Sequence, residues 1–452
     1  MKIIIAGYGK VGAAMTRQLA SEGYDLTVID SNKSALESGL ELYDIMGVHG
    51  NCATMEVLKE AGVESADLLI AATSADEINL LCCLTAHNLN KNIHTIARIR
   101  TPEYSEQIVM MRDSLGLSLL VNPEKQAAQE IERLIKYPGF LKREKFAHGR
   151  VEIVELRVTA DSPLNNITLA KLPSAAKCKI LVCTVLRNGE AINPNGDFVL
   201  ADGDRLYVTA TTNELARLLK NLGVITHRVK RVIICGGGRI TYYLAQMFEK
   251  GGPEVQIVER DYEKCMQLAE LLPRASVVNA DASDQTFWEG ERLSEDDAVV
   301  AMTGLDELNM VISLYVRSCG VKQIITKISR TESSAILDNL FFGTVICPKE
   351  LCSNTIVGYV RGMSNQTGSS IAVHRIAGGR SEATEFHVTR DTHNCGIPLK
   401  NIKLKKNVLI ACILHLSQII IPNGDSCFNP GDTVIVVSDT ERAISRLNDI
   451  FE

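Results

Sequence analysis

Residues 3–12 read Ile-Ile-Ile-Ala-Gly-Tyr-Gly-Lys-Val-Gly, which places three glycines directly behind an apolar run. A helical pattern follows over residues 13–20. Glycines at this spacing between a strand and a helix are typical of a dinucleotide-binding turn. Gly7 permits the tight turn, Gly9 lets the backbone approach a pyrophosphate, and Gly12 brings helix and strand close together. The alternative is a structural strand-to-helix turn that binds nothing.

A carboxylate stands at the end of the next expected strand. Asp30 follows the apolar residues 26–29, at about the 20-residue distance from which an acidic side chain accepts from ribose hydroxyls. The same carboxylate disfavours a 2′-phosphate. The sequence therefore predicts NAD(H), ATP or ADP as ligand, and NADP is not preferred.

The residues up to 122 alternate short apolar strands, expected at 2–7, 26–30, 68–73 and 94–99, with helical segments. This order predicts a parallel, doubly wound sheet with helices on both faces.

A helix is expected next, from Pro123 to about Ile135, and alternating strands follow at 151–158 and 179–185. Two turn signals, Asn188-Gly189 and Asn195-Gly196-Asp197, contain residues that tolerate the positive φ of tight turns. These features predict a small β-rich domain.

The glycine-rich opening occurs a second time, at residues 232–241, so the chain is internally repeated. The same number of residues separates the members of three pairs, Gly7 and Gly236, Asp30 and Glu259, and Arg98 and Lys327. The turns of the small domain also recur, at residues 423–425 and 431–432. The predicted fold class is α/β, with two tandem Rossmann-like doubly wound parallel-sheet domains, each followed by a small α+β domain.

Six segments follow from this pattern. They are a first Rossmann-like domain at 1–122, a connecting helix and linker at 123–148, a first small domain at 149–222, a second Rossmann-like domain at 229–348, a second connecting helix and linker at 349–368, and a second small domain at 369–452.

The second glycine turn departs from the first. It reads Gly236-Gly237-Gly238-Arg239-Ile240-Thr241, so a threonine replaces the third critical glycine. The added side chain is expected to loosen the packing of helix on strand. Glu259 still ends the following strand and is suited to hold a ribose. A functional second nucleotide site and a structural relic both remain open.

Polar residues also follow a later strand of the first domain. Thr73 and Ser74 precede a helix, and Ser74 and Glu77 have capping-box spacing. The carboxyl ends of strands line the ligand crevice in such sheets, so Thr73 and Ser74 either contact the nucleotide or only cap the helix.

Two arginines are expected at the same edge. Arg98 and Arg100 lie two residues apart, so on a strand they project to one face and their forked donors suit phosphate oxygens. Solvated surface arginines are the alternative. The second half has Lys327 and Ser329 instead, so phosphate binding is expected to be stronger in the first half.

Composition limits the classes of function. The 452 residues suffice for several domains, and the net charge of −6 makes nucleic acid an unlikely partner. The 13 cysteines lack metal-ligand spacing and no signal peptide precedes the first strand, so a reducing cytosol, and no metal, is expected. The most apolar stretch, 408–421, is too short to span a membrane. The histidines lie singly, so no catalytic residue is assigned.

The order of these features resembles the TrkA family, the peripheral regulatory subunits of Trk potassium uptake. The resemblance covers essentially the entire chain and rests on residues 7–12, Asp30, His49-Gly50-Asn51, residues 73–79, residues 97–104 and Asn122-Pro123-Glu124, with a second copy at 236–240, Glu259, Asp306-Glu307, Asn309 and Cys347-Pro348. It implies two tandem RCK modules, each an RCK_N (TrkA-N) and an RCK_C (TrkA-C) domain.

The resemblance also implies a function without catalysis. Members of this kind assemble as homo-tetramers on the cytoplasmic face of a Trk-type potassium-translocating membrane subunit, TrkH or TrkG-like, and change its conduction when nucleotide binds. With the turns described above, it gives as candidate ligand-binding residues Gly7, Tyr8, Gly9, Lys10, Val11, Asp30, Asn51, Thr73, Ser74, Arg98, Arg100, Gly236, Gly237, Gly238, Arg239, Ile240 and Glu259.

Two other functions remain open. A soluble NAD-dependent oxidoreductase would use the same glycine turn but also needs a substrate domain with a proton donor, and neither small domain has clustered acid-base residues. A structural adapter without a ligand is the second alternative.

Overall fold

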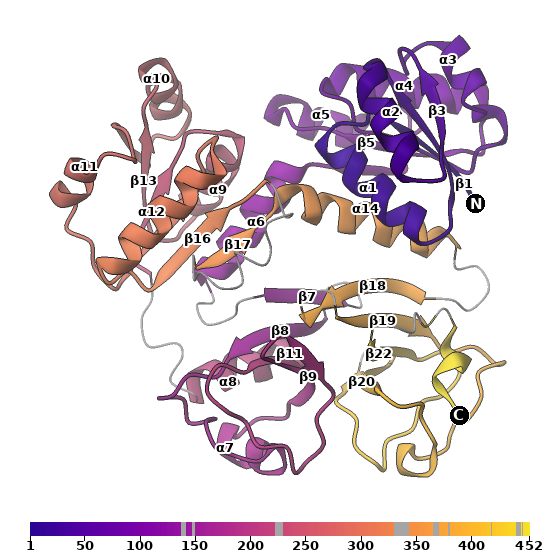
Figure 1. Cartoon of the computed structure of the whole chain (residues 1–452), viewed down its shortest axis with the longest axis vertical. Coiled ribbons are helices and arrows are strands. Elements are labelled where there is room, and N and C mark those ends of the chain that lie inside the picture. The colour runs from indigo at the N-terminus through magenta and orange to yellow at the C-terminus, as the bar shows by residue number, and fades with distance from the viewer. Residues whose placement is uncertain are drawn as a thin grey trace. The chain divides into compact units, whose positions relative to one another are not determined.

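Two parallel sheets form the larger part of the fold, as the computed structural model shows (Figure 1). The structure describes residues 1–136, 142–146, 150–221, 229–329, 343–364, 370–377, 380–416, 418–439, 444 and 446–452. The contacts divide the chain into two compact units: residues 1–135 with 229–357, and residues 136–228 with 358–452. Each unit therefore combines segments from both halves of the sequence.

The first parallel sheet has six strands in the order β3-β2-β1-β4-β5-β6. The strands are β1 (Lys2–Ala6), β2 (Asp25–Asp30), β3 (Met46–His49), β4 (Leu68–Ala71), β5 (His94–Arg98) and β6 (Leu119–Val121). The accompanying helices are α1 (Lys10–Ser21), α2 (Lys33–Leu42), α3 (Met55–Glu60), α4 (Asp76–Leu89), α5 (Pro102–Met111) and α6 (Pro123–Lys136), with a 3₁₀ turn η1 (Val63–Ser65). The chain order reverses between β1 and β4, which creates the crevice where such sheets bind ligands.

The second parallel sheet repeats this order as β14-β13-β12-β15-β16-β17. Its strands are β12 (Arg231–Cys235), β13 (Glu254–Glu259), β14 (Ser276–Asn279), β15 (Asp297–Ala301), β16 (Gln323–Lys327) and β17 (Thr344–Ile346). Its helices are α9 (Arg239–Glu249), α10 (Tyr262–Leu271), α11 (Gln285–Gly290), α12 (Asp306–Ser318) and α14 (Pro348–Ser364). The predicted pair of doubly wound Rossmann-like sheets is confirmed.

The helix that follows the first sheet packs on the second one. Ala127, Ala128 and Ile131 of α6 share a buried core with Val232 of β12 and Leu244 of α9. The Leu134 carbonyl also accepts from Gln323 Nε2 over 3.1 Å. The two parallel sheets of this unit are therefore joined through α6, since its apolar face completes the core of the second sheet.

The other unit contains two five-stranded antiparallel sheets with the same strand order, β10-β9-β11-β8-β7 and β21-β20-β22-β19-β18. The first is built from β7 (Lys142–Phe146), β8 (Val151–Arg157), β9 (Leu181–Arg187), β10 (Glu190–Ile192) and β11 (Arg205–Thr211), with η3 (Leu169–Lys171), α7 (Leu172–Ala176) and α8 (Thr212–Asn221). The second is built from β18 (Ser370–Ile376), β19 (Ser381–His387), β20 (Val408–His415), β21 (Gln418–Ile420) and β22 (Thr433–Asp439), with η5 (Leu399–Asn401) and η6 (Leu447–Ile450).

These small sheets share one apolar core. Ile153, Cys183 and Tyr207 from the first pack with Ala411 and Ile435 from the second. The predicted small domains after each parallel sheet are therefore confirmed as sheets, and they bury surface against one another.

A buried aspartate explains why Gly-Asp recurs in both small domains. Gly203 has φ +89° and Gly431 has φ +97°, so each turn needs a residue that tolerates the left-handed region. Asp204 then accepts from Arg187 Nε and Nη2, both at 2.7 Å. Asp432 lies 2.6 Å from His415 Nδ1.

Both turn signals mark turns, but only one of them uses positive φ. Asn188 and Gly189 do have positive φ, +51° and +79°, in the hairpin between β9 and β10. Asn195 and Gly196 do not, because the turn there closes through the Phe198 amide on the Asn195 carbonyl, 3.2 Å apart, inside a longer connection.

The boundaries of the six segments stay a prediction, and the limits at 148, 149, 222, 368 and 369 lie outside the described residues. Within the described residues, no helix is long and apolar enough to cross a bilayer. The apolar stretch 408–421 forms β20 and β21.

Candidate functional site

The first glycine turn is fixed by close backbone contacts. Gly7 has φ +102°, and a Cβ on it would lie 2.9 Å from the Thr73 backbone. A Cβ on Gly12 would lie 1.9 Å from the Gly7 carbonyl oxygen. Neither position accepts a side chain without rearrangement. A Cβ on Gly9, in contrast, would meet nothing within 4 Å. The fold therefore requires Gly7 and Gly12 but leaves the space in front of Gly9 open.

The second glycine turn has the same form, except that a threonine takes the place of the third glycine. Gly236 has φ +109°, and a Cβ on Gly238 would again meet nothing within 4 Å. Thr241, in the place of Gly12, is fully buried and its hydroxyl donates to the Gly236 carbonyl. A Cβ has no room at Gly12, so the second turn must leave more space for the Thr241 side chain.

Both turns lead into helices whose first amides lack an acceptor. Gly9 is the N-cap of α1 and Gly238 the N-cap of α9, and neither end carries a side-chain cap. The first N–H groups of a helix have no partner inside it and carry the positive end of its dipole. Such ends favour an anion in front of the glycines.

The two acidic side chains at the strand ends hold these turns. Asp30 accepts from the Tyr8 amide at 2.5 Å and from the Asn32 amide at 2.7 Å. Glu259 accepts from the Gly237 amide at 2.7 Å and from the Asp261 amide at 2.9 Å. Each carboxylate oxygen keeps a further lone pair, so both residues remain able to accept from a ribose hydroxyl.

Three further candidates lie around the first turn. The Tyr8 ring packs on α2, since a Cβ on Gly39 would lie 2.6 Å from it. Tyr8 therefore offers the site its backbone rather than its ring. Asn51 is exposed after β3, and its side-chain oxygen accepts from the Ala53 amide at 3.0 Å. Lys10 is exposed in the first turn of α1.

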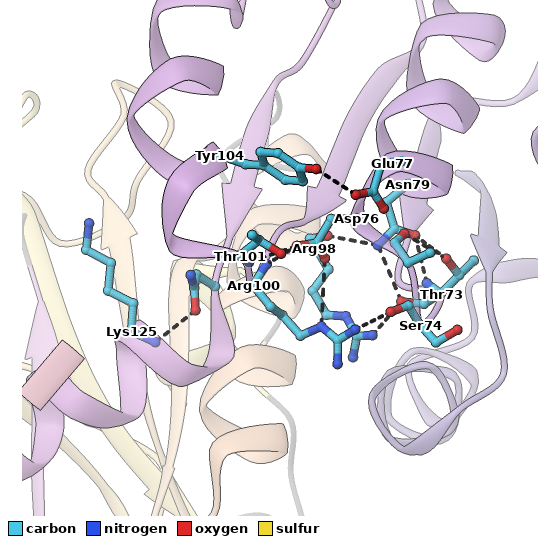
Figure 2. A network of polar contacts seen from close by, with 12 residues as sticks. Thr73, Ser74, Asp76, Glu77, Asn79, Arg98, Arg100, Thr101, Tyr104 and Lys125 are labelled. Atoms are coloured by element: carbon cyan, nitrogen blue, oxygen red, sulfur yellow. Dashed lines mark hydrogen bonds and ion pairs between the residues drawn. The ribbon is translucent and has the colours of Figure 1, made fainter. Parts of the chain in front are cut away.

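A buried asparagine organises the edge of the sheet next to this turn (Figure 2). Asn79 Oδ1 accepts from the Thr73 amide at 2.8 Å and from the Thr73 hydroxyl at 2.7 Å. Asn79 Nδ2 donates to the Arg98 carbonyl at 2.8 Å. This one side chain therefore connects the ends of β4 and β5. Sequence reasoning gave Asn79 no role.

The guanidinium groups of Arg98 and Arg100 both turn toward the β4–α4 loop in Figure 2. Arg98 donates to the Thr73 carbonyl and Arg100 to the Ser74 carbonyl. Burial, with Arg100 beside it, lowers the pKa of Arg98 from its usual value. Arg98 Nε is buried without a hydrogen-bond partner. The arginines are thus neither freely solvated nor fully satisfied.

The expected capping box is wrong. Helix α4 begins at Asp76 with Ala75 as its N-cap, and no side chain caps it. Ser74 is exposed and contributes its carbonyl to Arg100. Glu77 accepts from the Tyr104 hydroxyl at 2.8 Å.

Asp76 is the carboxylate that fixes this loop. Its Oδ2 accepts from the Arg100 amide at 2.9 Å and from the Thr101 amide at 2.8 Å. Burial by itself would raise the pKa of Asp76, but the hydrogen bonds from Thr101 and Arg100 and the Arg100 charge hold the pKa below its usual value. The ionised form is therefore the one that the fold stabilises.

The second half reproduces this network with different cations. Asn309 Oδ1 accepts from the Thr303 amide at 2.8 Å, and Asp306 Oδ2 accepts from the Ser329 amide at 2.8 Å. Lys327 Nζ donates to the Thr303 carbonyl at 2.6 Å, as Arg98 does to Thr73. In both halves Thr, Asp and Asn follow one another at intervals of three residues. This recurring pattern was the signal in the sequence that could have identified Asn79 and Asn309.

A cavity of about 330 Å³ lies inside this unit, between the two parallel-sheet domains. The N-terminal residues of four helices line it, from α1, α6, α9 and α14. Its charged residues are five cations and one carboxylate: Lys10, Arg98, Arg239, Lys327, Lys349 and Glu124. Burial lowers the pKa of Lys327, and the Lys10 charge adds to this while Asp306 opposes it.

Six predicted residues line this cavity: Lys10, Val11, Arg98, Gly238, Arg239 and Ile240. Asp30, Asn51 and Glu259 lie at the strand ends instead. Among the described residues, no group of three or more His, Cys, Asp or Glu side chains is placed to hold a metal ion.

Comparison with known proteins identifies the family of this chain. The model of the TrkA-N domain matches residues 3–123 and 232–348, and that of the TrkA-C domain matches residues 153–223. The chain belongs to the TrkA family. It is 32% identical to a Trk system potassium uptake protein TrkA homolog of Archaeoglobus fulgidus, over all of both chains. It is 30% identical to TrkA homolog 1 of Methanosarcina mazei, over 97% of each.

Solved structures share the fold of this TrkA family member. The GsuK RCK domain superposes with a TM-score of 0.61 at 18% identity, covering 97% of this chain and 92% of that one. The GsuK channel solved bound to NAD gives the same score and identity over 97% and 77%. The expected resemblance to TrkA and the expected pair of RCK modules are thereby confirmed.

We predict that Asp76→Asn destabilises the chain by about 1–3 kcal/mol near neutral pH, because two partly buried amides lose a charged acceptor. The folded pKa of Asp76 is depressed, so its contribution is present above the unfolded pKa of about 4 and disappears as the pH falls through the folded value. Urea unfolding at several pH values should therefore show the two proteins converging in acid. Asp202→Asn, at an exposed site, is the control. A difference that is independent of pH would contradict the assignment.

Proposed function

We propose that this chain is a cytoplasmic regulatory subunit that binds an adenine nucleotide and thereby controls a Trk-type potassium-translocating membrane subunit. The observation that carries the proposal is the first glycine turn. Packing requires Gly7 and Gly12, whereas nothing in the folded chain requires the small residue at Gly9. The open space there faces the free amides of α1, so an anion bound in this space would explain why a glycine stands at position 9.

The acidic strand ends support a ligand with a free ribose. Asp30 and Glu259 each accept one bond from the glycine turn and keep acceptor capacity toward the crevice. Their charge opposes a 2′-phosphate. NAD(H), ATP and ADP fit this requirement, and a solved relative of the same fold was bound to NAD.

The cationic cavity supports phosphate binding on the side of Lys10, Arg98 and Arg239. This cavity holds five cations against one carboxylate, so its net positive charge attracts an anion. An anionic ligand in either crevice gains from this field, and its charge relieves the repulsion between Lys10 and Lys327.

Regulation rather than catalysis follows from the family and from the architecture. The relatives are Trk system potassium uptake proteins, and their names support a membrane subunit, TrkH or TrkG-like, as the partner that we propose. The chain then acts at the cytoplasmic face of the membrane through that partner. A ligand shifts such an assembly only by its different affinity for two arrangements, and several identical sites on one ring add their contributions.

Alanine at Gly9 and at Gly238 should separate the two candidate sites. A methyl group there meets no protein atom, so folding should change by about 0.5–1 kcal/mol at most, while the approach of a phosphate is blocked. Calorimetry with NADH, NAD, ATP and ADP should show about tenfold or greater loss for Gly9→Ala at the first site. Gly238→Ala reports the second site in the same way.

These variants are sharper than Asp30→Ala, which removes the acceptor of the Tyr8 amide and disturbs the turn itself. Wild-type protein that binds none of the four nucleotides would refute the sensor and leave a structural adapter. NADH oxidation with a carbonyl substrate would favour the oxidoreductase.

Assembly of several copies, as a tetramer, is part of the proposal. Corresponding faces of α4 and α12 expose apolar side chains: Leu81 is 49% exposed, Val311 61% and Leu314 40%. Leu81 and Val311 occupy corresponding positions of the two helices, so both parallel-sheet domains expose an apolar side chain there, which suits a ring of like modules. A second copy of the chain is therefore the occupant that we assign to these faces.

We expect Leu81→Glu and Val311→Glu to shift the purified chain to smaller species, because a charge in a buried apolar contact is costly. Light scattering after size exclusion measures the mass. Met266→Glu, at an exposed methionine of α10, is the matched control and should leave the mass unchanged. Identical masses for all variants would contradict these faces as the interface.

A further inference from the structure

One side chain of the second half reaches directly into the polar network of the first. Tyr243 lies on α9, the helix that begins at the second glycine turn, and it is 4% exposed. Its hydroxyl donates to the Arg100 carbonyl at 3.2 Å and accepts from Asn122 Nδ2 at 2.9 Å. Both partners belong to the first parallel-sheet domain. All three residues lie in the same compact unit.

Arg100 is the residue through which this contact acts. Its amide donates to Asp76 and its guanidinium donates to the Ser74 carbonyl. Thr73 and Ser74 form the loop beside the first glycine turn, because Gly7 packs against the Thr73 backbone. A hydrogen bond on the Arg100 carbonyl therefore fixes the residue whose other groups shape the loop at the first crevice.

Asn122 holds the Tyr243 hydroxyl through a second hydrogen bond. Its Oδ1 accepts from the Lys125 amide at 2.8 Å and so caps α6, the helix that packs on the second sheet. Its Nδ2 is oriented toward Tyr243 by that bond. The tyrosine hydroxyl thus accepts from the Asn122 side chain and donates to the Arg100 backbone, and removal of its oxygen leaves both partly buried groups without this partner.

The contact has no counterpart in the other direction. Ala14 on α1 corresponds to Tyr243, Cys347 precedes α14 where Asn122 precedes α6, and Ser329 takes the place of Arg100. Alanine has no hydroxyl and Ser329 has no guanidinium. The first domain therefore receives this support from the second domain and does not return it.

We propose that Tyr243 is a positioning residue for the nucleotide site of the first domain, which is thereby completed by the second domain. The proposal rests on the proposed function, since it concerns the same site. It makes the helix of the second glycine turn sensitive to the state of the first crevice. By linkage, any such sensitivity acts equally in both directions.

The test replaces only the hydroxyl, with Tyr243→Phe, so that the ring keeps its place in the apolar core. Tyr242→Phe is the matched control, because the Tyr242 hydroxyl contacts Gln246 of its own helix at 3.5 Å. Both changes are made in a Gly238→Ala chain, which reports the first site, and in a Gly9→Ala chain, which reports the second. ADP and NADH are the probes, titrated by calorimetry into the full-length protein.

Tyr243→Phe should weaken binding at the first site about threefold to tenfold, the effect of one or two net hydrogen bonds. Binding at the second site should stay unchanged, although Tyr243 lies on the helix of that site. A merely structural role predicts the opposite order, because a loosened α9 affects its own turn first. Tyr242→Phe should bind as the parent chain does.

Equal affinity of the parent and the Tyr243→Phe chain at the first site would overturn the inference and leave the proposed function intact. A loss confined to the second site, or equal at both, would also overturn it. Wild-type protein that binds neither probe would overturn the proposed function and this inference together. If the Gly9→Ala chain binds no probe, the first-site affinities of the Tyr243→Phe and Tyr242→Phe chains are compared, together with their unfolding midpoints. A weaker first-site affinity of Tyr243→Phe alone, with equal midpoints, supports the inference. Equal affinities, or a loss accompanied by a lower midpoint, overturn it.

Discussion

The contact of Gly7 with the Thr73 backbone, together with that of Gly12 with the Gly7 carbonyl, is the constraint on which the first domain depends. It brings the turn after β1 against the end of β4, the two strands between which the chain order reverses. Asp30 ties the same turn to the end of β2 through the Tyr8 amide. Three strand ends are thus held at one edge, and the helix amides of α1 are directed into the space between them.

The two halves hold their strand ends together with the same hydrogen bonds but with different charged residues. Thr, Asp and Asn recur in matching roles at both sheet edges, so the duplicated fold keeps this hydrogen-bonded scaffold. The cations differ: Arg98 and Arg100 stand where Lys327 and Ser329 stand in the second half. Tyr243 adds a further difference, since its hydroxyl donates to the first domain and the corresponding Ala14 has no hydroxyl to return this bond. The duplication has therefore produced one framework with two unequal sites.

Much of the fold could be predicted from the sequence, because the glycine turns and apolar runs report strands and helices locally. The short strands β3 and β6 were not identified, since three or four residues give too little pattern. The helix at residues 123–136 was predicted, but its place on the second sheet was not, because its apolar face fits either sheet. The hydrogen-bond partners of polar side chains were the hardest feature to predict from the sequence. Ser74 had the spacing of a cap, yet α4 begins at Asp76 and is left uncapped.

Nucleotide binding at the first turn is the step that we propose controls potassium conduction. The most direct measurement is rubidium uptake into proteoliposomes that contain the Trk-type membrane subunit, with and without this chain and nucleotide. The account predicts uptake that depends on the chain and changes with nucleotide, and a Gly9→Ala chain that supports uptake but no longer responds. Uptake that is the same with or without nucleotide, for the wild-type chain, would contradict it.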